Sequence, residues 1–292
     1  MTDSEAAIGV IGGSGLYELE GLEDVDRVSL ETPYGEPSDA FITGVLAGRR
    51  MFFLPRHGAG HLLLPHELNY RAKIWGMKKL GVDRLISVSA VGSLQEDIEP
   101  GHLVLVDQFI DRTRHRPITM FGDGVVAHVP MADPVCNPLR SKLFSLKDVT
   151  KTTVHNGGTY LCMEGPQFST RAESQLYRQW GCHVIGMTNM PEAKLAREAE
   201  ICYTTLALAT DYDCWRTAED DVSLESILAV LKANVERAKA LLKAYAEQAA
   251  PKSTCELCGT AAEQGLMTPP DQIPPERRKQ LAPIFDRFLK DG

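Results

Sequence analysis

Short apolar segments typical of β-strands alternate with segments typical of α-helices along most of this chain, and this alternation constrains the fold more than any other feature. We expect strands at residues 6–11, 40–46, 50–54, 84–91, 102–110, 158–163, 183–187 and 201–210. We expect helices at residues 65–80, 169–180, 191–200 and 222–248. This order predicts an α/β protein, with a central mixed, partly parallel β-sheet flanked by helices on both faces.

The length of 292 residues suits one large domain with a core that needs no disulfides or metals to stabilise it. We expect a catalytic domain over residues 1–250, with no internal repeat. From residue 251 the composition changes to proline pairs and many charges, which predicts an irregular C-terminal tail over 251–292. An amphipathic segment at 277–289 predicts a terminal helix that docks on the body.

Composition narrows the possible partners. The formal net charge of −8 argues against nucleic acid, because affinity for a phosphate backbone comes mainly from clustered Lys and Arg. No secretory signal and no apolar stretch of membrane-spanning length is visible, so we expect a cytoplasmic protein without a membrane partner. Scattered cysteines inside apolar runs indicate buried thiols in a reducing compartment.

Three segments offer groups that could bind an anion. Residues 12–15 form a Gly-Gly-Ser-Gly turn, Arg56 and His57 follow a predicted strand, and residues 87–93 carry hydroxyls and small side chains. Each segment also has a simpler explanation, as an ordinary turn or a solvated strand end, and the glycines match neither the P-loop nor the dinucleotide-binding fingerprint. Their joint occurrence near strand ends of an α/β chain favours a ligand site, since ligands bind outside those ends.

A second candidate site follows the predicted strand at 201–210. Asp211 and Asp213 are flanked by aromatic residues, which suits a flat ligand carrying N–H donors, such as a purine with an exocyclic amine. A strand-ending Asx turn is the simpler alternative. A hard metal ion is not expected here, because Ca²⁺ and Mg²⁺ sites need more oxygen ligands.

The remaining candidates lie in two loops and the tail. Phe168 can stack on a base, whereas Ser169, with Glu173 nearby, resembles a helix N-cap. The turn at 186–192 places Thr188 within possible reach of a sugar or phosphate. Cys255 and Cys258 form a lone C-x-x-C pair, which is weak evidence for zinc; two thiols on the surface are an equally good interpretation.

Seven motifs in collinear order resemble those of the 5′-methylthioadenosine phosphorylases of the trimeric purine nucleoside phosphorylase family. They are IGVIGGSGL at 8–16, RHG at 56–58, SAVGSL at 89–94, DQFIDRT at 107–113, HVPMADP at 128–134, EGPQFS at 164–169 and ATDYDCW at 209–215. The resemblance runs from about residue 7 to 248, and it implies a homotrimer with active sites near subunit contacts. It also leaves open a disulfide between Cys255 and Cys258, as in some prokaryotic relatives.

The resemblance assigns roles to individual residues. The implied phosphate-binding residues are Ser14, Arg56, His57, Ser89, Ala90 through its backbone, and Thr188. Ser14 and Ser89 stand where the family often has threonine. The implied nucleoside-binding residues are Met187 at the ribose, Phe168 and Ser169 at the base, Asp213 at the 6-amino group, and His128, Leu224 and Ile227 at the 5′ substituent. Asp211 resembles the acid that binds or protonates the purine N7, and an aspartate there, rather than asparagine, favours adenine.

The resemblance therefore implies phosphorolysis of S-methyl-5′-thioadenosine to adenine and 5-methylthioribose 1-phosphate. We expect no metal and no cofactor, with inorganic phosphate as the co-substrate. The alternatives are a broader purine nucleoside phosphorylase acting on adenosine or 5′-methylthioinosine, a nucleoside-binding protein without catalysis, and a hydrolase whose turnover ignores phosphate.

Overall fold

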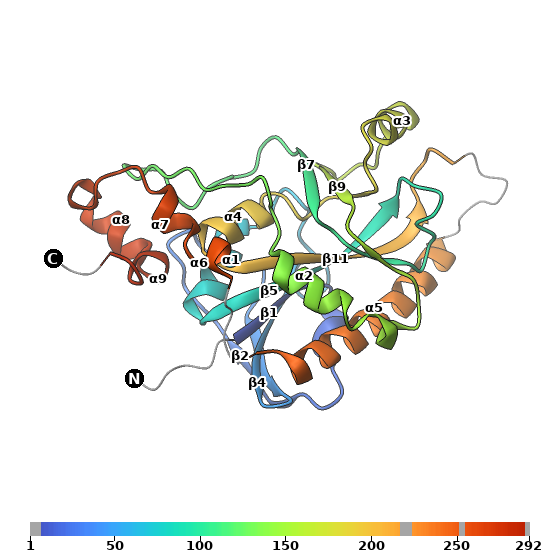
Figure 1. The fold of residues 1–292 in the computed structure, drawn as a ribbon, viewed down its shortest axis with the longest axis horizontal. Coiled ribbons are helices and arrows are strands. Elements are labelled where there is room, and N and C mark those ends of the chain that lie inside the picture. Colours follow the sequence, from blue (N-terminus) through green and yellow to red (C-terminus); the bar gives the residue numbers. More distant parts are fainter. Residues whose placement is uncertain (1–6, 217–223, 251–254, 290–292) are drawn as a thin grey trace.

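The protein is described here from a computed structural model that covers residues 7–216, 224–250 and 255–289 (Figure 1). Its strands are β1 (Ala7–Gly12), β2 (Glu23–Val28), β3 (Phe41–Leu46), β4 (Arg49–Pro55), β5 (Val82–Ser93), β6 (Leu103–Leu105), β7 (Gln108–Arg112), β8 (Val154–Asn156), β9 (Thr159–Met163), β10 (Val184–Gly186) and β11 (Cys202–Tyr212). Its helices are α1 (Tyr70–Lys79), α2 (Asn137–Phe144), α3 (Arg171–Gln179), α4 (Glu192–Glu198), α5 (Leu224–Gln248), α6 (Glu256–Gly259), α7 (Ala261–Gly265), α8 (Pro275–Gln280) and α9 (Ala282–Phe285).

All eleven described strands join one mixed sheet, which confirms the predicted α/β class. The main path runs β2-β3-β4-β1-β5-β10-β9-β7, and β11 pairs with β5 and leads through β6 to β8. The pairs β1 with β4, β1 with β5 and β5 with β11 are parallel, whereas β3 with β4 and β5 with β10 are antiparallel. None of the described helices is long and apolar enough to cross a membrane.

The long strand β5 is where the sheet divides. Its first half pairs with β1 up to Ser87, and its end pairs with β10 at Gly92 and Ser93, while β11 follows it throughout. Between these two partners one edge of β5 is left open. Ala90 lies in this gap and is exposed, although most of the strand is buried.

Helices cover both faces of the sheet because strand side chains alternate between two hydrophobic clusters. In β1, Ala7 and Ile11 pack on one face in the cluster that contains Ile74 of α1 and Leu195 of α4. Ile8 and Val10 pack on the opposite face in the cluster that contains Leu241 of α5. Figure 1 shows α5 running along the sheet with α2 close by, while α1 and α4 lie nearer the C-terminal helices.

The C-terminal tail is more helical and more buried than the sequence predicts. It folds into α6 to α9, and the segment expected as one terminal helix is divided between α8 and α9. Leu281, Ile284 and Phe285 join the hydrophobic core, and the carbonyl of Gln280 accepts a hydrogen bond from the Trp75 indole at 2.7 Å. The interpretation of Cys258 as a surface thiol is wrong, because this side chain is buried.

Several predicted elements differ in detail. The segment 102–110 is two strands, β6 and β7, and not one, and the edge strands β2 and β8 were not predicted because they are short or polar. Helix α1 begins at Tyr70, where the side chain of Asn69 caps it, later than the proline at 65 suggests. The N-cap of α3 is Thr170 and not Ser169, since Thr170 and Glu173 form a capping box.

Candidate active site

Arg56 lies at the centre of the predicted anion site and is held from several sides. It follows β4, and its backbone N–H donates to the carbonyl of Gly12 at 2.8 Å, which joins the glycine turn after β1 to the Arg-His turn. Its guanidinium donates to the carbonyl of Val88 at 2.8 Å and to Ser87 Oγ at 2.6 Å. The side chain is buried, so these contacts fix its position next to β5.

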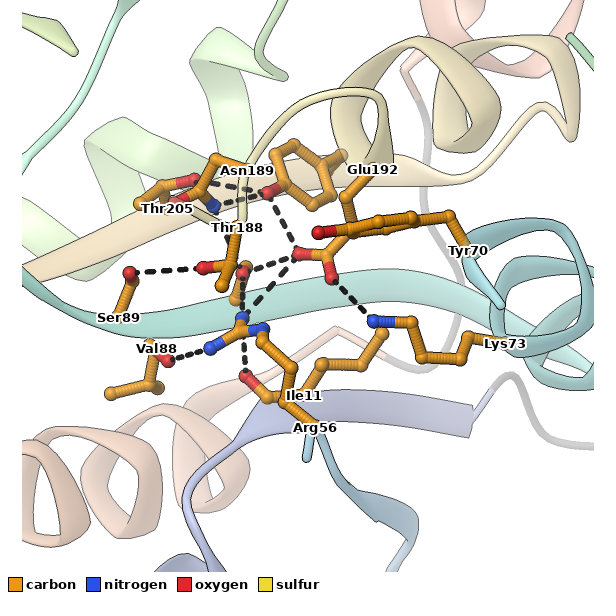
Figure 2. Close-up of polar contacts among 12 residues, drawn as sticks. Ile11, Arg56, Tyr70, Lys73, Val88, Ser89, Thr188, Asn189, Glu192 and Thr205 are labelled. Atoms are coloured by element: carbon orange, nitrogen blue, oxygen red, sulfur yellow. Dashed lines mark hydrogen bonds and ion pairs between the residues drawn. The ribbon is translucent and has the colours of Figure 1, made fainter. Parts of the chain in front are cut away.

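A buried carboxylate balances the charge of Arg56 (Figure 2). Glu192 Oε1 lies 3.5 Å from Arg56 and accepts hydrogen bonds from Ser87 at 2.5 Å and Tyr203 at 3.0 Å, while Oε2 lies 3.7 Å from Lys73 Nζ. Burial raises the pKa of Glu192, but Arg56 and Lys73 outweigh it and keep the pKa below its ordinary value. Burial lowers the pKa of Lys73 to about 7, although Glu192 opposes that shift.

The hydroxyls of Ser89 and Thr188 meet on the other side of the guanidinium. Their oxygens lie 3.2 Å apart, and Figure 2 shows both on the opposite side of Arg56 from Lys73. The next residue, Asn189, donates to Ser87, Tyr203 and Thr205, which fixes the turn that carries Thr188. The two hydroxyls, the Arg56 guanidinium and the exposed residue Ala90 therefore lie together at the part of β5 that no longer pairs with β1.

His57 is held as a neutral ring in one tautomer. Its Nδ1 lies 2.8 Å from the carbonyl of Leu63, so this nitrogen must carry the proton and donate, because a carbonyl can only accept. Burial lowers the pKa of His57 to about 4, and the Arg56 charge contributes. At neutral pH, Nε2 is therefore an acceptor, and it suits an anion that carries its own O–H, as monohydrogen phosphate does.

The two predicted acids gather at the end of β5. Asp211 is opposite Gly92 in the β5–β11 pairing, and a Cβ placed on Gly92 would lie 3.4 Å from Asp211 Oδ2 and 3.4 Å from the Cβ of Asp213. Burial raises the pKa of Asp211, and the charge of Asp213 adds to this, although a 2.6 Å hydrogen bond from Thr210 opposes it. Burial also raises the pKa of Asp213. Both shifts favour the protonated acids more than in water.

The loop at 164–169 borders the same region. Cys214 Sγ donates to the carbonyl of Ser169 at 3.2 Å, which connects this loop to the residues after Asp213. Phe168 is 82% exposed and lines a hollow of about 440 Å³ together with Ser169 and the start of α3. Met187 packs closely against this loop at Gly165. A Cβ atom added to that glycine would lie only 2.6 Å from the Met187 sulfur.

The two halves of the site lie on one strand at a distance suited to a nucleoside. Ser89 and Gly92 are three residues apart on β5, which is about 10 Å at the usual rise of a strand. The anion-binding groups stand at one end of this span, and the two acids stand at the other. A ribose between a phosphate and a purine fills a gap of this size.

Not every predicted residue joins the site within one chain. His128 is exposed, and its N–H donates to the carbonyl of Gly265 at the end of α7, which Figure 1 shows far from α3 and the end of β11. The side chains of Ser14, Leu224 and Ile227 lie outside the described residues, although Ser14 begins the turn after β1 and Leu224 begins α5.

Comparison with known proteins identifies the family of the chain. A family model described as the phosphorylase superfamily matches residues 7–247. The chain belongs to the phosphorylase superfamily. This phosphorylase is 58% identical over 286 residues to the S-methyl-5′-thioadenosine phosphorylase of Geobacter sulfurreducens, covering 98% of this chain and 100% of that protein.

Solved structures place the phosphorylase in the same family. A methylthioadenosine phosphorylase from an Antarctic soil metagenomic library has a TM-score of 0.90 at 48% identity, covering 96% of this chain and 99% of the other. A variant of the adenosine/methylthioadenosine phosphorylase of Schistosoma mansoni, in complex with methylthioadenosine, has a TM-score of 0.83 at 31% identity and covers 90% and 99%. These matches confirm the resemblance seen in the motifs.

The structure adds residues to the phosphorylase site that sequence reasoning missed. Glu192 and Lys73 anchor Arg56, and Arg116 donates to the carbonyls of Met187, Met190 and Glu164 and so joins the loop at 164–169 to the turn at 186–192. The available sequence signal is a lysine at a position flanked by apolar residues, as Lys73 is by Ala72 and Ile74. It does not reveal which partner lies opposite.

Proposed function

We propose that this phosphorylase converts S-methyl-5′-thioadenosine and inorganic phosphate to adenine and 5-methylthioribose 1-phosphate. The observation that carries the proposal is the pairing of a Ser89–Thr188–Arg56 anion cradle with the Asp211–Asp213 pair along one strand. The full-length similarity to curated enzymes of that activity agrees with it.

The cradle positions phosphate for attack. A phosphate oxygen forms a bond to the anomeric carbon while the bond from that carbon to the purine N9 breaks, and the sugar passes through an oxocarbenium-like state. Arg56, Ser89 and Thr188 stabilise the anion. Neutral His57 accepts a hydrogen bond through Nε2 from the O–H of monohydrogen phosphate. Because phosphate is held under the sugar, the attack becomes effectively unimolecular and avoids the entropy cost of bringing two free molecules together.

The acids stabilise the departing base. The electron pair of the broken bond moves into the purine, so the base needs a proton or a hydrogen bond at N7. Asp211, whose pKa burial raises, donates there, and Asp213 accepts from the 6-amino group. A 6-oxo group offers no such donor, which favours adenine over hypoxanthine.

The 5′ side and the assembly belong to the same proposal. We assign His128, Leu224 and Ile227 to the 5′-methylthio pocket, with phosphorylase subunits arranged as a homotrimer. The exposure of His128 and Phe168 supports this arrangement, because a neighbouring subunit can complete a site that one chain leaves open. The reaction requires no metal or cofactor, and buried thiols such as Cys162 and Cys182 fit the cytoplasm.

A phosphate-dependence assay tests the proposal. Release of the free base is measured from methylthioadenosine, adenosine, inosine and methylthioinosine, with and without phosphate. We expect phosphate-dependent turnover that is highest for methylthioadenosine. Equal rates on adenosine or methylthioinosine would indicate a broader phosphorylase, and rates that ignore phosphate would indicate a hydrolase.

A further inference from the structure

Four cysteines from three separate segments of the chain meet inside the protein, at the opposite end of β11 from Asp211. Cys136 precedes α2, Cys202 begins β11, and Cys255 and Cys258 flank the start of α6 in the tail. Their sulfur atoms all lie within 4.8 Å of one another. We call this group the cysteine cluster.

The spacing of the sulfur atoms fits one metal ion. A tetrahedral Zn²⁺ with bonds of about 2.3 Å to four thiolates places the sulfurs about 3.8 Å apart, which lies inside the observed limit. Two of the ligands come from a C-x-x-C pair, a spacing that structural zinc sites use. All seven cysteines are present as thiols in the structure.

The surroundings of the cysteine cluster suit a negatively charged tetrathiolate. Cys136 and Cys258 are buried, whereas Cys255 is half-buried. A buried site with two net negative charges needs nearby cations, and Arg197 Nη1 lies 3.3 Å from Cys258 Sγ and can donate to that thiolate. The N–H of Cys136 is already used, since it donates to the carbonyl of Tyr203 at 2.7 Å and fixes the start of α2.

A route from solvent also exists. A hollow of about 180 Å³ lies beside the cysteine cluster and is lined by Cys136 and Cys255. Arg84 and Lys142 line the same hollow and add positive charge on that side. An ion can therefore reach the sulfurs without unfolding of the sheet.

We propose that the cysteine cluster binds one Zn²⁺ with Cys136, Cys202, Cys255 and Cys258 as ligands. Binding releases the four thiol protons to solvent and forms four Zn–S bonds without any oxidant. The ion joins the tail at α6 to the sheet at β11 and to α2, and its role is structural. The C-x-x-C pair alone gave weak evidence, because its two partners lie more than fifty residues away in sequence.

Metal analysis of the purified full-length protein tests this proposal. The protein is expressed with added zinc, purified in a reducing buffer and analysed by mass spectrometry of the elements. We expect about one zinc per chain. Refolding or exchange with Co²⁺ in place of zinc should give the intense thiolate-to-cobalt absorption of a tetrahedral site.

Variants separate this site from the other cysteines. Zinc content should fall at least tenfold in the double variant Cys255→Ser with Cys258→Ser, and it should be unchanged in Cys182→Ser, a buried cysteine in another hydrophobic cluster. Wild-type protein without zinc and without the cobalt absorption would overturn the proposal, as would disulfides between these cysteines in the purified protein. The cobalt experiment needs no variant, so it decides the question even if the double variant misfolds. Phosphorolysis, measured in parallel, reports separately on the proposed function.

Discussion

The buried network behind the proposed phosphate cradle predicts a large effect from one substitution that removes a charge, Glu192→Gln. Glutamine keeps the size of the side chain but removes the charge that lies 3.5 Å from Arg56 and 3.7 Å from Lys73. Glu192 is fully buried, so in the variant neither water nor a dissolved anion can reach Arg56 and Lys73 to compensate their charge. Removing one partner of a buried ion pair costs about 3–5 kcal/mol, since an uncompensated charge is left in the interior.

That cost can be measured in two ways. With about 2–4 °C lost per kcal/mol in a domain near this size, Tm should fall by about 10 °C. Urea unfolding should give a loss of about 3 kcal/mol or more in the free energy of unfolding. Because Glu192 positions Arg56, the apparent KM for phosphate should also rise far more than the KM for the nucleoside, whereas kcat at saturation should change less.

Two further variants identify the cause. Glu236→Gln removes the partner of Lys239 at 2.9 Å on the surface, and it should cost less than about 1 kcal/mol. Adding Lys73→Met to Glu192→Gln removes the excess positive charge, so the double variant should lose less stability than the two single variants added together. A Glu192→Gln protein within about 1 kcal/mol of wild type, with an unchanged KM for phosphate, would refute the reasoning.

Three other substitutions test the site and the fold. Asp211→Asn should lower turnover on methylthioadenosine by orders of magnitude and relatively favour 6-oxopurines, because asparagine cannot give up a proton at N7; unchanged selectivity in steady-state assays would remove Asp211 from base reading. Arg56→Ala should raise the KM for phosphate far more than that for the nucleoside, and an equal rise in both would indicate a purely structural arginine. Burial raises the pKa of Glu198 to about 7 from an ordinary value of 4.5, so the folded state binds its proton more tightly than the unfolded chain. Stability is therefore lost as pH rises from about 4.5 to about 7, by about 3 kcal/mol in all, and stays lower above that pH. Glu198→Gln should remove much of the difference in Tm between pH 5 and pH 8.5, and an identical pH dependence in both proteins would contradict this.

Local pattern was enough to predict most of the fold. Apolar runs identified β1, β3, β4, β9 and β11 to within two residues, because buried strands of a mainly parallel region are apolar on both faces. The short edge strands were missed because their side chains are not buried on both sides. The cap of α3 was placed one residue early, since Ser169 and Thr170 are both good caps and only the three-residue spacing to Glu173 distinguishes them.

The site was harder to derive, because its residues are connected by tertiary contacts. Asp211 and Asp213 could be selected from their place at the end of a buried strand, although Asp211 lies within β11 and only Asp213 follows it. The burial of Glu192 and Lys73 against Arg56 depends on how α1 and α4 pack on the sheet, which no local pattern encodes. The cysteine cluster has the same property, since three segments contribute to it.

Strand β5 explains why both ends of the site are held so firmly. Ser87 fixes Arg56, Ser89 meets Thr188, and Gly92 leaves room for the acids, so one rigid strand sets the distance between the proposed phosphate and base subsites. A bulge at Thr210 shifts the β5–β11 register, so that Asp211 and not Thr210 is opposite Gly92. Without that extra residue the alternation of the strand would turn the Asp211 side chain to the other face of the sheet. The geometry of the chemistry is therefore a property of the sheet itself, and adjustment to the nucleoside is left to the exposed loop that carries Phe168.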